Sequence, residues 1–321
     1  MWSRPIFPNK LSKGQLMQRY ILARVFQAIL TLLLLSLAVF LSVKISGDPA
    51  VYMLGPDQGR LEYEMMQRKM GLDRPIAVQY WNFLTNMAQL DFGKSHFLER
   101  PARDVLFERF PATLQLAGAA FVLALAMGIP LGILSAVKRD SVFDQFGKLF
   151  ATLGIATPNF WIAIMLIMFF GAILGWLPTY GRGGPDHFIL PAFVLGWSAM
   201  SGMVRLGRSS MLEVLDSEYV KFARIKGLGE SVVIWKHALK NAMIPLLTFS
   251  GLTLAGLLNG SVAVEVVFAW PGIGRMMLQG IRTGDFPIVQ AAVMASGLFY
   301  ILTALLVDIL YAYVNPRIRY D

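Results

Sequence analysis

Long uncharged apolar runs alternate along this chain with shorter segments that hold most of the charged residues. A soluble helical protein spreads its charges along one face of every helix, so this clumping favours a protein with several membrane spans. Crossing a bilayer core of about 30 Å takes roughly 20 helical residues. The runs of sufficient length predict six spans, at Ile21–Val43, Thr113–Val137, Leu149–Leu174, Phe188–Val204, Met243–Val267 and Ile288–Val314.

Lysine and arginine indicate which side of the membrane each segment faces. The segment before the first predicted span, the loops 138–148 and 205–242 and the C-terminal tail carry a clear excess of Lys and Arg over acidic residues, whereas the alternate segments are close to balanced. Because cytoplasmic loops concentrate Lys and Arg, the first set is predicted to be cytoplasmic. We therefore expect a cytoplasmic N-terminal segment 1–20, a cytoplasmic tail 315–321, and a multi-pass chain with both termini inside.

The pattern also predicts how the chain is divided. The first apolar run is longer than the 7 to 15 residues of a signal peptide, so residues 21–43 are expected to remain as a transmembrane helix. The polar, proline-containing segment 44–110 is predicted to be an extracytoplasmic loop domain, with helices at Leu61–Met70 and Tyr80–Leu90. Residues 111–314 form the main transmembrane domain, with five helices and the loop 205–242. The predicted fold class is an all-α membrane protein.

Composition narrows the chemistry. The chain has 56% hydrophobic and 15% charged residues, which supports the membrane interpretation. It has no cysteine, which excludes disulfides, thiolate metal sites and cysteine nucleophiles. Its histidines, His96, His187 and His237, show no metal-ligand spacing, so we expect no metal site. The net charge of +9 follows from the basic loops, and no basic stripe is interleaved with aromatic residues, so nucleic acid is not an expected partner.

The loop 205–242 carries the most informative pattern. Ser217 as a cap, Glu218 in the first turn, Arg224 and Lys226 at the end and Gly227 just beyond predict a short helix. A second helix follows it, so the two are expected to form a compact knob facing the cytoplasm. The chain has neither a Gly-x-x-x-x-Gly-Lys-Ser/Thr motif nor a complete Gly-x-Gly-x-x-Gly motif, so it shows no loop that would bind nucleotide phosphates and no cofactor is expected in this chain. The energy for a transport function would have to come from outside this chain.

Two classes of membrane protein, ion-driven transporters and hydrolases, make specific demands on the sequence. A secondary transporter driven by an ion gradient should show inverted repeats or paired broken helices with acids at the membrane midplane, and the two three-span halves show no convincing repeat. A secondary transporter driven by an ion gradient remains the alternative function. A membrane-embedded hydrolase would need a nucleophile and a base, yet there is no Gly-x-Ser-x-Gly and no histidine within a predicted span. The chain is therefore not expected to be an enzyme.

The knob sequence resembles the cytoplasmic loop of one branch of binding-protein-dependent ABC permeases, the dipeptide/oligopeptide/nickel branch. The matching positions are Glu218, Tyr219, Val220, Ala223, Arg224, Lys226, Gly227, Leu228, His237, Ala238, Asn241, Ala242 and Pro245. Similar motifs outside the loop are Asp91-Phe-Gly-Lys-Ser95, Thr157-Pro-Asn-Phe-Trp161 and Glu265-Val-Val-Phe-Ala-Trp-Pro-Gly272. One departure lies at Gly284-Asp-Phe-Pro287, where the branch usually has Arg-Asp-Tyr-Pro.

The resemblance implies a type I ABC importer transmembrane domain, the first permease of a two-permease pair, in a bacterial inner membrane and in contact with membrane lipid. Implied partners are a second homologous permease, two ATP-binding subunits that hold ATP and Mg²⁺, and an extracytoplasmic substrate-binding protein. The implied cargo is peptides or a related small solute. ATPase contact is implied for Glu218, Tyr219, Phe222, Ala223, Lys226, Gly227 and Leu228. A possible outer gate is implied for Glu265, Pro271 and Gly272.

Overall fold

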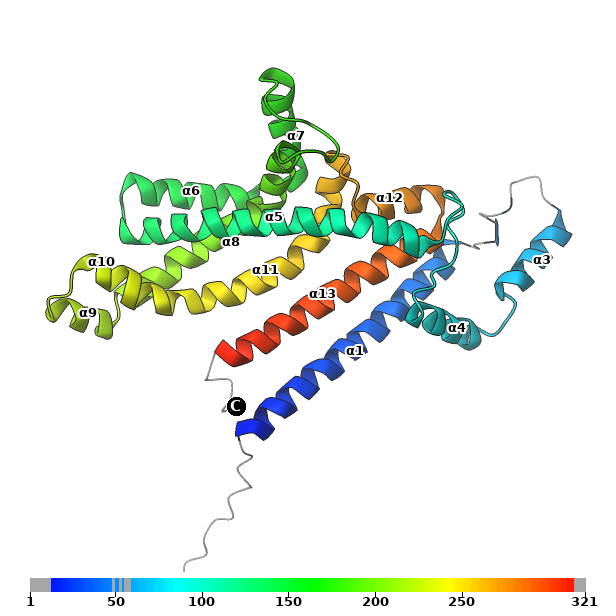
Figure 1. Cartoon of the computed structure of the whole chain (residues 1–321), viewed down its shortest axis with the longest axis horizontal. Coiled ribbons are helices and arrows are strands. Elements are labelled where there is room, and N and C mark those ends of the chain that lie inside the picture. The colour runs from blue at the N-terminus through cyan, green and yellow to red at the C-terminus, as the bar shows by residue number, and fades with distance from the viewer. Residues whose placement is uncertain (1–12, 48–49, 52–53, 55–58, 315–321) are drawn as a thin grey trace, which may run out of the picture.

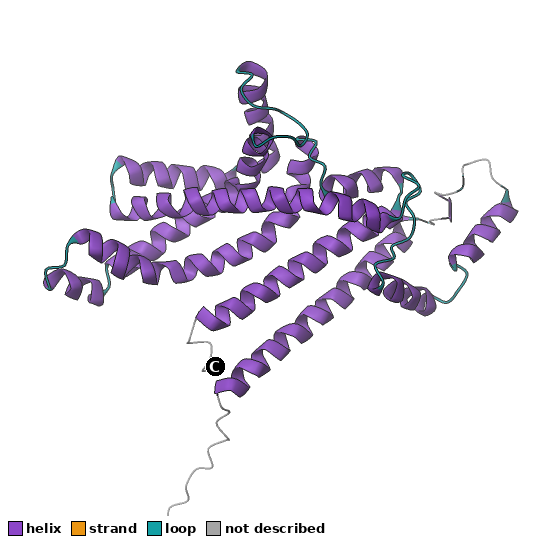
Figure 2. Cartoon of the chain, in the orientation of Figure 1, coloured by secondary structure: helices purple, strands orange, loops and turns teal. Residues whose placement is uncertain are grey.

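The computed structural model describes the chain except for residues 1–12, 48–49, 52–53, 55–58 and 315–321 (Figure 1). Most of the predicted N-terminal segment and all of the predicted tail therefore lie outside the described residues. The described part is built of helices joined by loops, without a strand (Figure 2). Its helices are α1 (Lys13–Ser46), α3 (Arg60–Met70), α4 (Ile76–Ala88), α5 (Ala102–Val137), α6 (Val142–Ala156), α7 (Asn159–Leu166), α8 (Asp186–Leu215), α9 (Glu218–Ile225), α10 (Glu230–Val232), α11 (Leu239–Val267), α12 (Ile273–Thr283) and α13 (Phe286–Val314), with π-helical turns η1 (Ile167–Ile173) and η2 (Val233–Ala238).

Within the described residues, five helices are long and apolar enough to cross a membrane. They are α1, α5, α8, the run from α10 through η2 into α11, and α13. They correspond to five of the six predicted spans, and the all-α membrane fold is confirmed. Several extend past the predicted ends: α8 continues from the predicted limit at Val204 to Leu215, and α5 begins at Ala102. The predicted boundary between the loop domain and the transmembrane domain, at 110/111, therefore falls inside α5.

The third predicted span, Leu149–Leu174, is not one straight helix. The chain bends by 109° between α6 and the α7–η1 segment. Pro158 has no backbone N–H to donate, and its ring disfavours the helical conformation at the preceding residue. Thr157 accordingly has extended backbone angles, with φ −97° and ψ 127°. The third predicted span therefore corresponds to a bent pair of helices, in which α7 leaves the bundle at a steep angle (Figure 1).

Helices α5 and α8 form the tightest contact in the bundle. A Cβ added at Gly128 would lie 2.9 Å from the carbonyl oxygen of Met200, and one at Gly132 would lie 2.8 Å from that of Val204. These are contacts with backbone that cannot rotate away, so only glycine allows this approach. The paired helices also bury Leu116 and Val194 in the main apolar core. They give the molecule a rigid centre on which α6 and α11 pack.

The two ends of the bundle differ. One end carries α9 and α10 together with the turn between α5 and α6, and we call it the knob end (Figure 1). The opposite end carries α3, α4 and α12. There α4 packs on α1, where the rings of Phe40 and Tyr80 lie 5.4 Å apart between centroids. The predicted helices Leu61–Met70 and Tyr80–Leu90 correspond to α3 and α4, although α4 begins four residues earlier, at Ile76.

Candidate functional site

The knob consists of α9 and the start of the following helix. Ser217 occupies the N-cap position of α9 as predicted, but its hydroxyl donates to the carbonyl of Val214 at 2.5 Å and does not cap the helix. Gly227 lies just beyond α9 with φ +79°, a left-handed conformation that glycine adopts without a steric penalty. The chain can therefore reverse within a few residues and begin α10 at Glu230. The first predicted short helix is confirmed, whereas the second is not a separate helix, because α10 continues through η2 into α11.

The inner face of α9 is buried in an apolar cluster. Val220 and Ala223 pack with Ile133 of α5, Met211 of α8 and Val233 of η2. Every one of these five side chains is less than 9% exposed. Because close-packed side chains move together, a displacement of α9 must be shared with the ends of α5, α8 and α11.

The outer face of α9 is apolar and exposed. Phe222 is 62% and Ile225 78% exposed, and Tyr219, Leu228 and Trp235 are also exposed. We call these five side chains the knob face. Large apolar side chains gathered at one exposed end of a molecule are typical of a surface that binds another protein.

Ion pairs hold the knob in shape. Arg224 donates to Glu230 at 2.7 and 3.2 Å, which joins the end of α9 to the start of α10. Lys221 donates to Glu218 at 2.8 Å, and this hydrogen bond raises the pKa of the Lys221 ammonium group. The hydroxyl of Tyr219 accepts from Asn241 of α11 at 2.8 Å. These contacts fix α9 relative to the next helix without covering the knob face.

The seven predicted ATPase-contact residues lie together on the knob, and one of them faces inward. Six of them are exposed, namely Glu218, Tyr219, Phe222, Lys226, Gly227 and Leu228. Ala223 faces inward and supports the helix from beneath. Sequence reasoning missed Ile225 and Trp235. Ile225 follows Phe222 at the three-residue spacing that places side chains on one helix face, so that spacing could have identified it.

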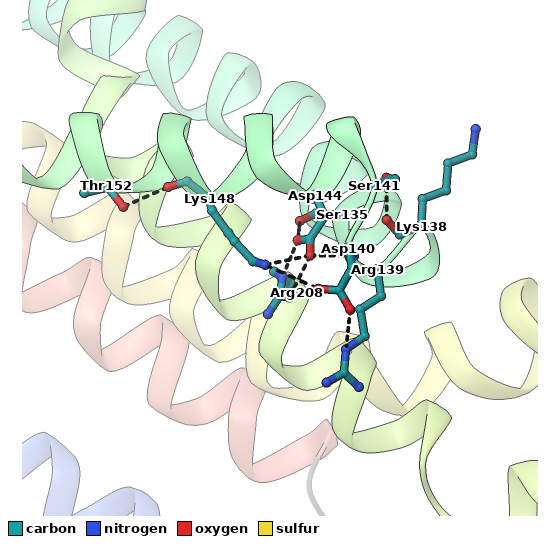
Figure 3. Close-up of polar contacts among 9 residues, drawn as sticks. All are labelled: Ser135, Lys138, Arg139, Asp140, Ser141, Asp144, Lys148, Thr152 and Arg208. Atoms are coloured by element: carbon teal, nitrogen blue, oxygen red, sulfur yellow. Dashed lines mark hydrogen bonds and ion pairs between the residues drawn. The ribbon is translucent and has the colours of Figure 1, made fainter.

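A buried carboxylate lies behind the knob (Figure 3). Asp144 of α6 is 0% exposed and accepts hydrogen bonds from Ser135 at 2.6 Å and from Arg208 at 2.6 and 3.0 Å. The backbone N–H of Asp140 donates to it at 3.0 Å, and the ammonium group of Lys148 lies 2.9 Å away. Asp144 therefore joins α5, the α5–α6 turn, α6 and α8 in one polar cluster.

This cluster could not be found from sequence spacing. Asp144 and Arg208 are 64 residues apart and follow no local motif, so both were counted only as charges of the predicted cytoplasmic loops. In the structure Arg208 lies on α8, two turns before that helix ends ahead of α9. The cluster thus fixes the helix that leads into the knob.

The predicted outer-gate residues meet at the opposite end of the bundle. Glu265 is fully buried and accepts hydrogen bonds from the hydroxyl of Thr113 at 2.7 Å and from the N–H of Arg275 at 3.1 Å. Gly272 lies so close to the Glu265 carboxylate that a Cβ there would overlap it. Pro271 precedes Gly272 in the turn that leads into α12. Glu265 therefore ties α11, α5 and the start of α12 together.

The motifs Asp91-Phe-Gly-Lys-Ser95 and Gly284-Asp-Phe-Pro287 also meet. The hydroxyl of Ser95 donates to Asp285, which is 2% exposed and lies between α12 and α13. Within the described residues, Nε2 of His96 and Oδ1 of Asp285 are buried without a hydrogen-bond partner. Burial lowers the pKa of His96 below its ordinary 6.5, and the nearby Asp285 carboxylate opposes this shift.

A pH dependence follows from His96. Since its pKa is depressed in the folded chain, an exposed His96 takes up a proton before the buried one as the pH falls below 6.5. Segment 91–101 should then open more easily at pH 5.5 than at pH 7.5, which hydrogen exchange corrected for intrinsic rates would measure. His96→Gln should reduce this difference. Asp285→Asn removes the charge of the carboxylate that faces His96 and so shows how much that group contributes. An unchanged pH dependence in His96→Gln would assign it to other groups.

Comparisons with known proteins agree with this architecture. A family model described as "Binding-protein-dependent transport system inner membrane component" matches residues 128–320, and the corresponding N-terminal family model matches residues 17–117. The chain is 41% identical over 305 residues to the Glutathione transport system permease protein GsiC of Salmonella typhimurium strain LT2, covering 95% of this chain and 100% of that protein. The Escherichia coli K12 protein of the same name is 40% identical over the same coverage.

A solved structure shows the same fold. The crystal structure of an amino acid ABC transporter with histidines covers 67% of this chain and 94% of its own, with a TM-score of 0.52 and 16% identity. The family models together span the bundle, the knob and the segment that contains α3 and α4. The chain belongs to the binding-protein-dependent transport system inner membrane components, the membrane permeases of ABC importers.

Proposed function

We propose that this chain forms one half of the translocation pathway of an ATP-driven importer and that its knob binds a separate ATP-binding subunit. The observation that carries the docking proposal is the exposed apolar knob face above a buried inner face that is continuous with α5, α8 and α11. A surface that only needed to be soluble would not expose Phe222 and Ile225 at its tip. The knob face is therefore the contact, and the inner cluster transmits the movement.

Each predicted contact residue has a role in this proposal. Phe222 and Leu228, with Ile225 and Trp235 added from the structure, supply apolar contact area. Glu218, Tyr219 and Lys226 supply the polar rim, and Gly227 allows the chain to reverse closely beneath the partner. Ala223 is small enough to seat α9 on the apolar cluster. ATP and Mg²⁺ are bound by the two ATP-binding subunits, and this chain is the non-catalytic component.

A second homologous permease would complete the pathway. The bent α7–η1 segment leaves the bundle with exposed apolar side chains along its length, including Phe160, Trp161, Met168, Phe169 and Ile173. An apolar arm of this kind is suited to packing against the transmembrane helices of another subunit. We therefore propose that it contacts the partner permease within the membrane.

The remaining assignments concern orientation and cargo. We propose that the knob end and both termini are cytoplasmic, in agreement with the basic loops, and that a substrate-binding protein delivers solute to the opposite end in the inner membrane. We propose that Glu265, Pro271 and Gly272 belong to the outer gate, a role supported by the contacts of Glu265 with Arg275 and Gly272 at the turn before α12. The proposed cargo is peptides or a related small solute, which the name of the glutathione permease relatives supports.

An ion-gradient-driven mechanism has little support in the described structure. Its acidic side chains in the bundle are held by neighbours: Glu265 by Thr113, and Asp308 of α13 by Arg24 of α1 at 3.3 Å. A proton or ion relay would need acids that can change partners during transport. Fixed pairs that join helices are better explained as structural contacts.

Cross-linking tests the docking proposal directly because the chain contains no cysteine. Lys226→Cys, at the end of α9, should cross-link to a single cysteine placed in the docking groove of a co-expressed ATP-binding subunit. Arg282→Cys, on α12 at the opposite end, is the matched control and should not. Equal cross-linking from both positions, or none from Lys226→Cys in an assembled transporter, would contradict the proposal.

A further inference from the structure

A cavity of about 430 Å³ lies between α6 and α8, next to the Asp144 cluster. It is lined by Gly147, Lys148, Ala151, Thr152, Ile155, Ala156, Val204, Arg205, Arg208 and Ser209. Ala151 and Ala156 give the α6 side of the cavity small side chains, and Lys148 of α6 with Arg205 and Arg208 of α8 supply its basic side chains. Neither the knob docking nor the outer gate uses this cavity.

The charge of the cavity is positive and partly uncompensated. Lys148 and Arg208 both contact the buried Asp144, at 2.9 and 2.6 Å, and Lys148 also lies 3.9 Å from Asp140, which pairs with Arg139 as well (Figure 3). The two carboxylates therefore serve three cations even before Arg205 is counted. Arg205 is exposed and has neither an ion pair nor a hydrogen bond with any described residue, and the hydroxyl of Ser209 is likewise without a partner there. The site therefore offers a fixed cationic wall and two free donors to an anion.

The position of these cations matches the expected level of lipid phosphates. Lys148 lies one residue before the predicted membrane boundary at Leu149, and Arg205 lies one residue after the boundary at Val204. Both residues line the cavity, so the two predicted membrane boundaries lie side by side there. Deeper toward the bilayer, its lining changes to Ala156 and Ile155, and Leu153 of α6 is exposed beside it. The cavity is thus basic at the interface and apolar below, which is the polarity of a phospholipid.

We propose that this cavity binds the phosphate group of an anionic phospholipid from the leaflet at the knob end. Basic pockets between transmembrane helices bind anionic lipid headgroups, and each Lys or Arg near such a surface adds to the attraction. Arg205 and Ser209 donate to the phosphate, while Lys148 and Arg208 supply charge from their fixed positions on Asp144. A bound lipid bridges α6 and α8 and so stabilises the helix that continues into the knob.

A soluble phosphate shares the headgroup chemistry but not the apolar contacts. It would leave Ile155 and the neighbouring exposed side chains of α6 without a partner, whereas an acyl chain covers them. The lipid is therefore the favoured source of the phosphate group. Inorganic phosphate should compete for the site only if the site binds free phosphate.

Native mass spectrometry of the intact, delipidated transporter tests this proposal. Titration with phosphatidylglycerol should show saturable binding at least about tenfold tighter than phosphatidylcholine with the same acyl chains, since the choline ammonium group cancels the phosphate charge and is repelled by the basic side chains of the cavity. Arg205→Gln should weaken phosphatidylglycerol binding by about tenfold and phosphatidylcholine binding less, so the preference for the anionic lipid should fall. Lys236→Gln, which removes an exposed cation outside the cavity, is the matched control and should change neither.

The remaining measurements separate the two sources of phosphate. Inorganic phosphate at equal concentration should not displace phosphatidylglycerol, and Ser209→Ala should weaken binding by a few-fold without changing assembly of the transporter. Equal binding of both lipids, an unchanged affinity in Arg205→Gln, or the same loss in Lys236→Gln would overturn the proposal. Displacement by inorganic phosphate would overturn the assignment to a lipid.

Discussion

Phe222→Asp is expected to abolish uptake while the chain still inserts into the membrane. Phe222 is 62% exposed at the centre of the knob face, so the substitution removes an aromatic side chain without opening a cavity in the core. Aromatic side chains at interface centres often contribute about 2 kcal/mol or more, or roughly 30-fold in affinity. An added carboxylate would also be desolvated on docking. Uptake and recovery of the ATP-binding subunits with the tagged chain should therefore fall together.

The controls separate docking from folding. Phe222→Leu keeps an apolar side chain of similar reach and should retain most of the uptake. Membrane level and thermal unfolding of the purified Phe222→Asp chain should match those of the unmodified chain, because the inner face of α9 is unchanged. Normal co-purification and uptake in Phe222→Asp would show that the knob face is not the contact.

Arg208→Ala is expected to destabilise the chain more than any other single change in the Asp144 cluster. It leaves the fully buried Asp144 with Lys148 and hydrogen bonds from Ser135 and Asp140, but without its bidentate partner. Removing one member of a buried ion pair costs about 3–5 kcal/mol, and the remaining Lys148 places this site toward the lower value. The measurement is thermal unfolding of the purified chain, with uptake reported in parallel.

Two further variants make this prediction specific. Asp144→Asn with Arg208→Ala should recover part of the stability, because the double variant no longer buries a carboxylate that has lost its bidentate partner. Arg139→Ala is the matched control: its 3.6 Å pair with Asp140 lies at the surface, so its loss should cost less than about 1 kcal/mol (Figure 3). Equal destabilisation by Arg139→Ala and Arg208→Ala would mean that burial of Asp144 is not the cause.

Features set by local sequence were predictable. Apolar run length located the spans, and the order of Glu218, Arg224 and Gly227 located α9, since helix ends depend on residues within a few positions. The break at Pro158 was visible as a proline, but its 109° bend was not, because the angle depends on how α6 and α7 pack. Proline is also tolerated within helices here, as Pro111 and Pro130 in α5 show.

Features set by contacts between distant residues were not predictable from one sequence. The Asp144–Arg208 pair and the Ser95–Asp285 contact each join residues that are far apart along the chain. Glu265 was implied as a possible outer-gate residue, but its partners Thr113 and Arg275 depend on how α5 and α12 meet α11. The inward orientation of Ala223 likewise follows from the apolar cluster beneath α9.

The most direct test of the central claim is the energy source of transport. The tagged chain, expressed with its neighbouring genes and reconstituted into lipid vesicles, should co-purify with a second permease and ATP-binding subunits. The account predicts uptake that requires ATP, persists when ion gradients are collapsed, and increases with the loaded substrate-binding protein. A chain that purifies alone and transports on an ion gradient without ATP would contradict the account.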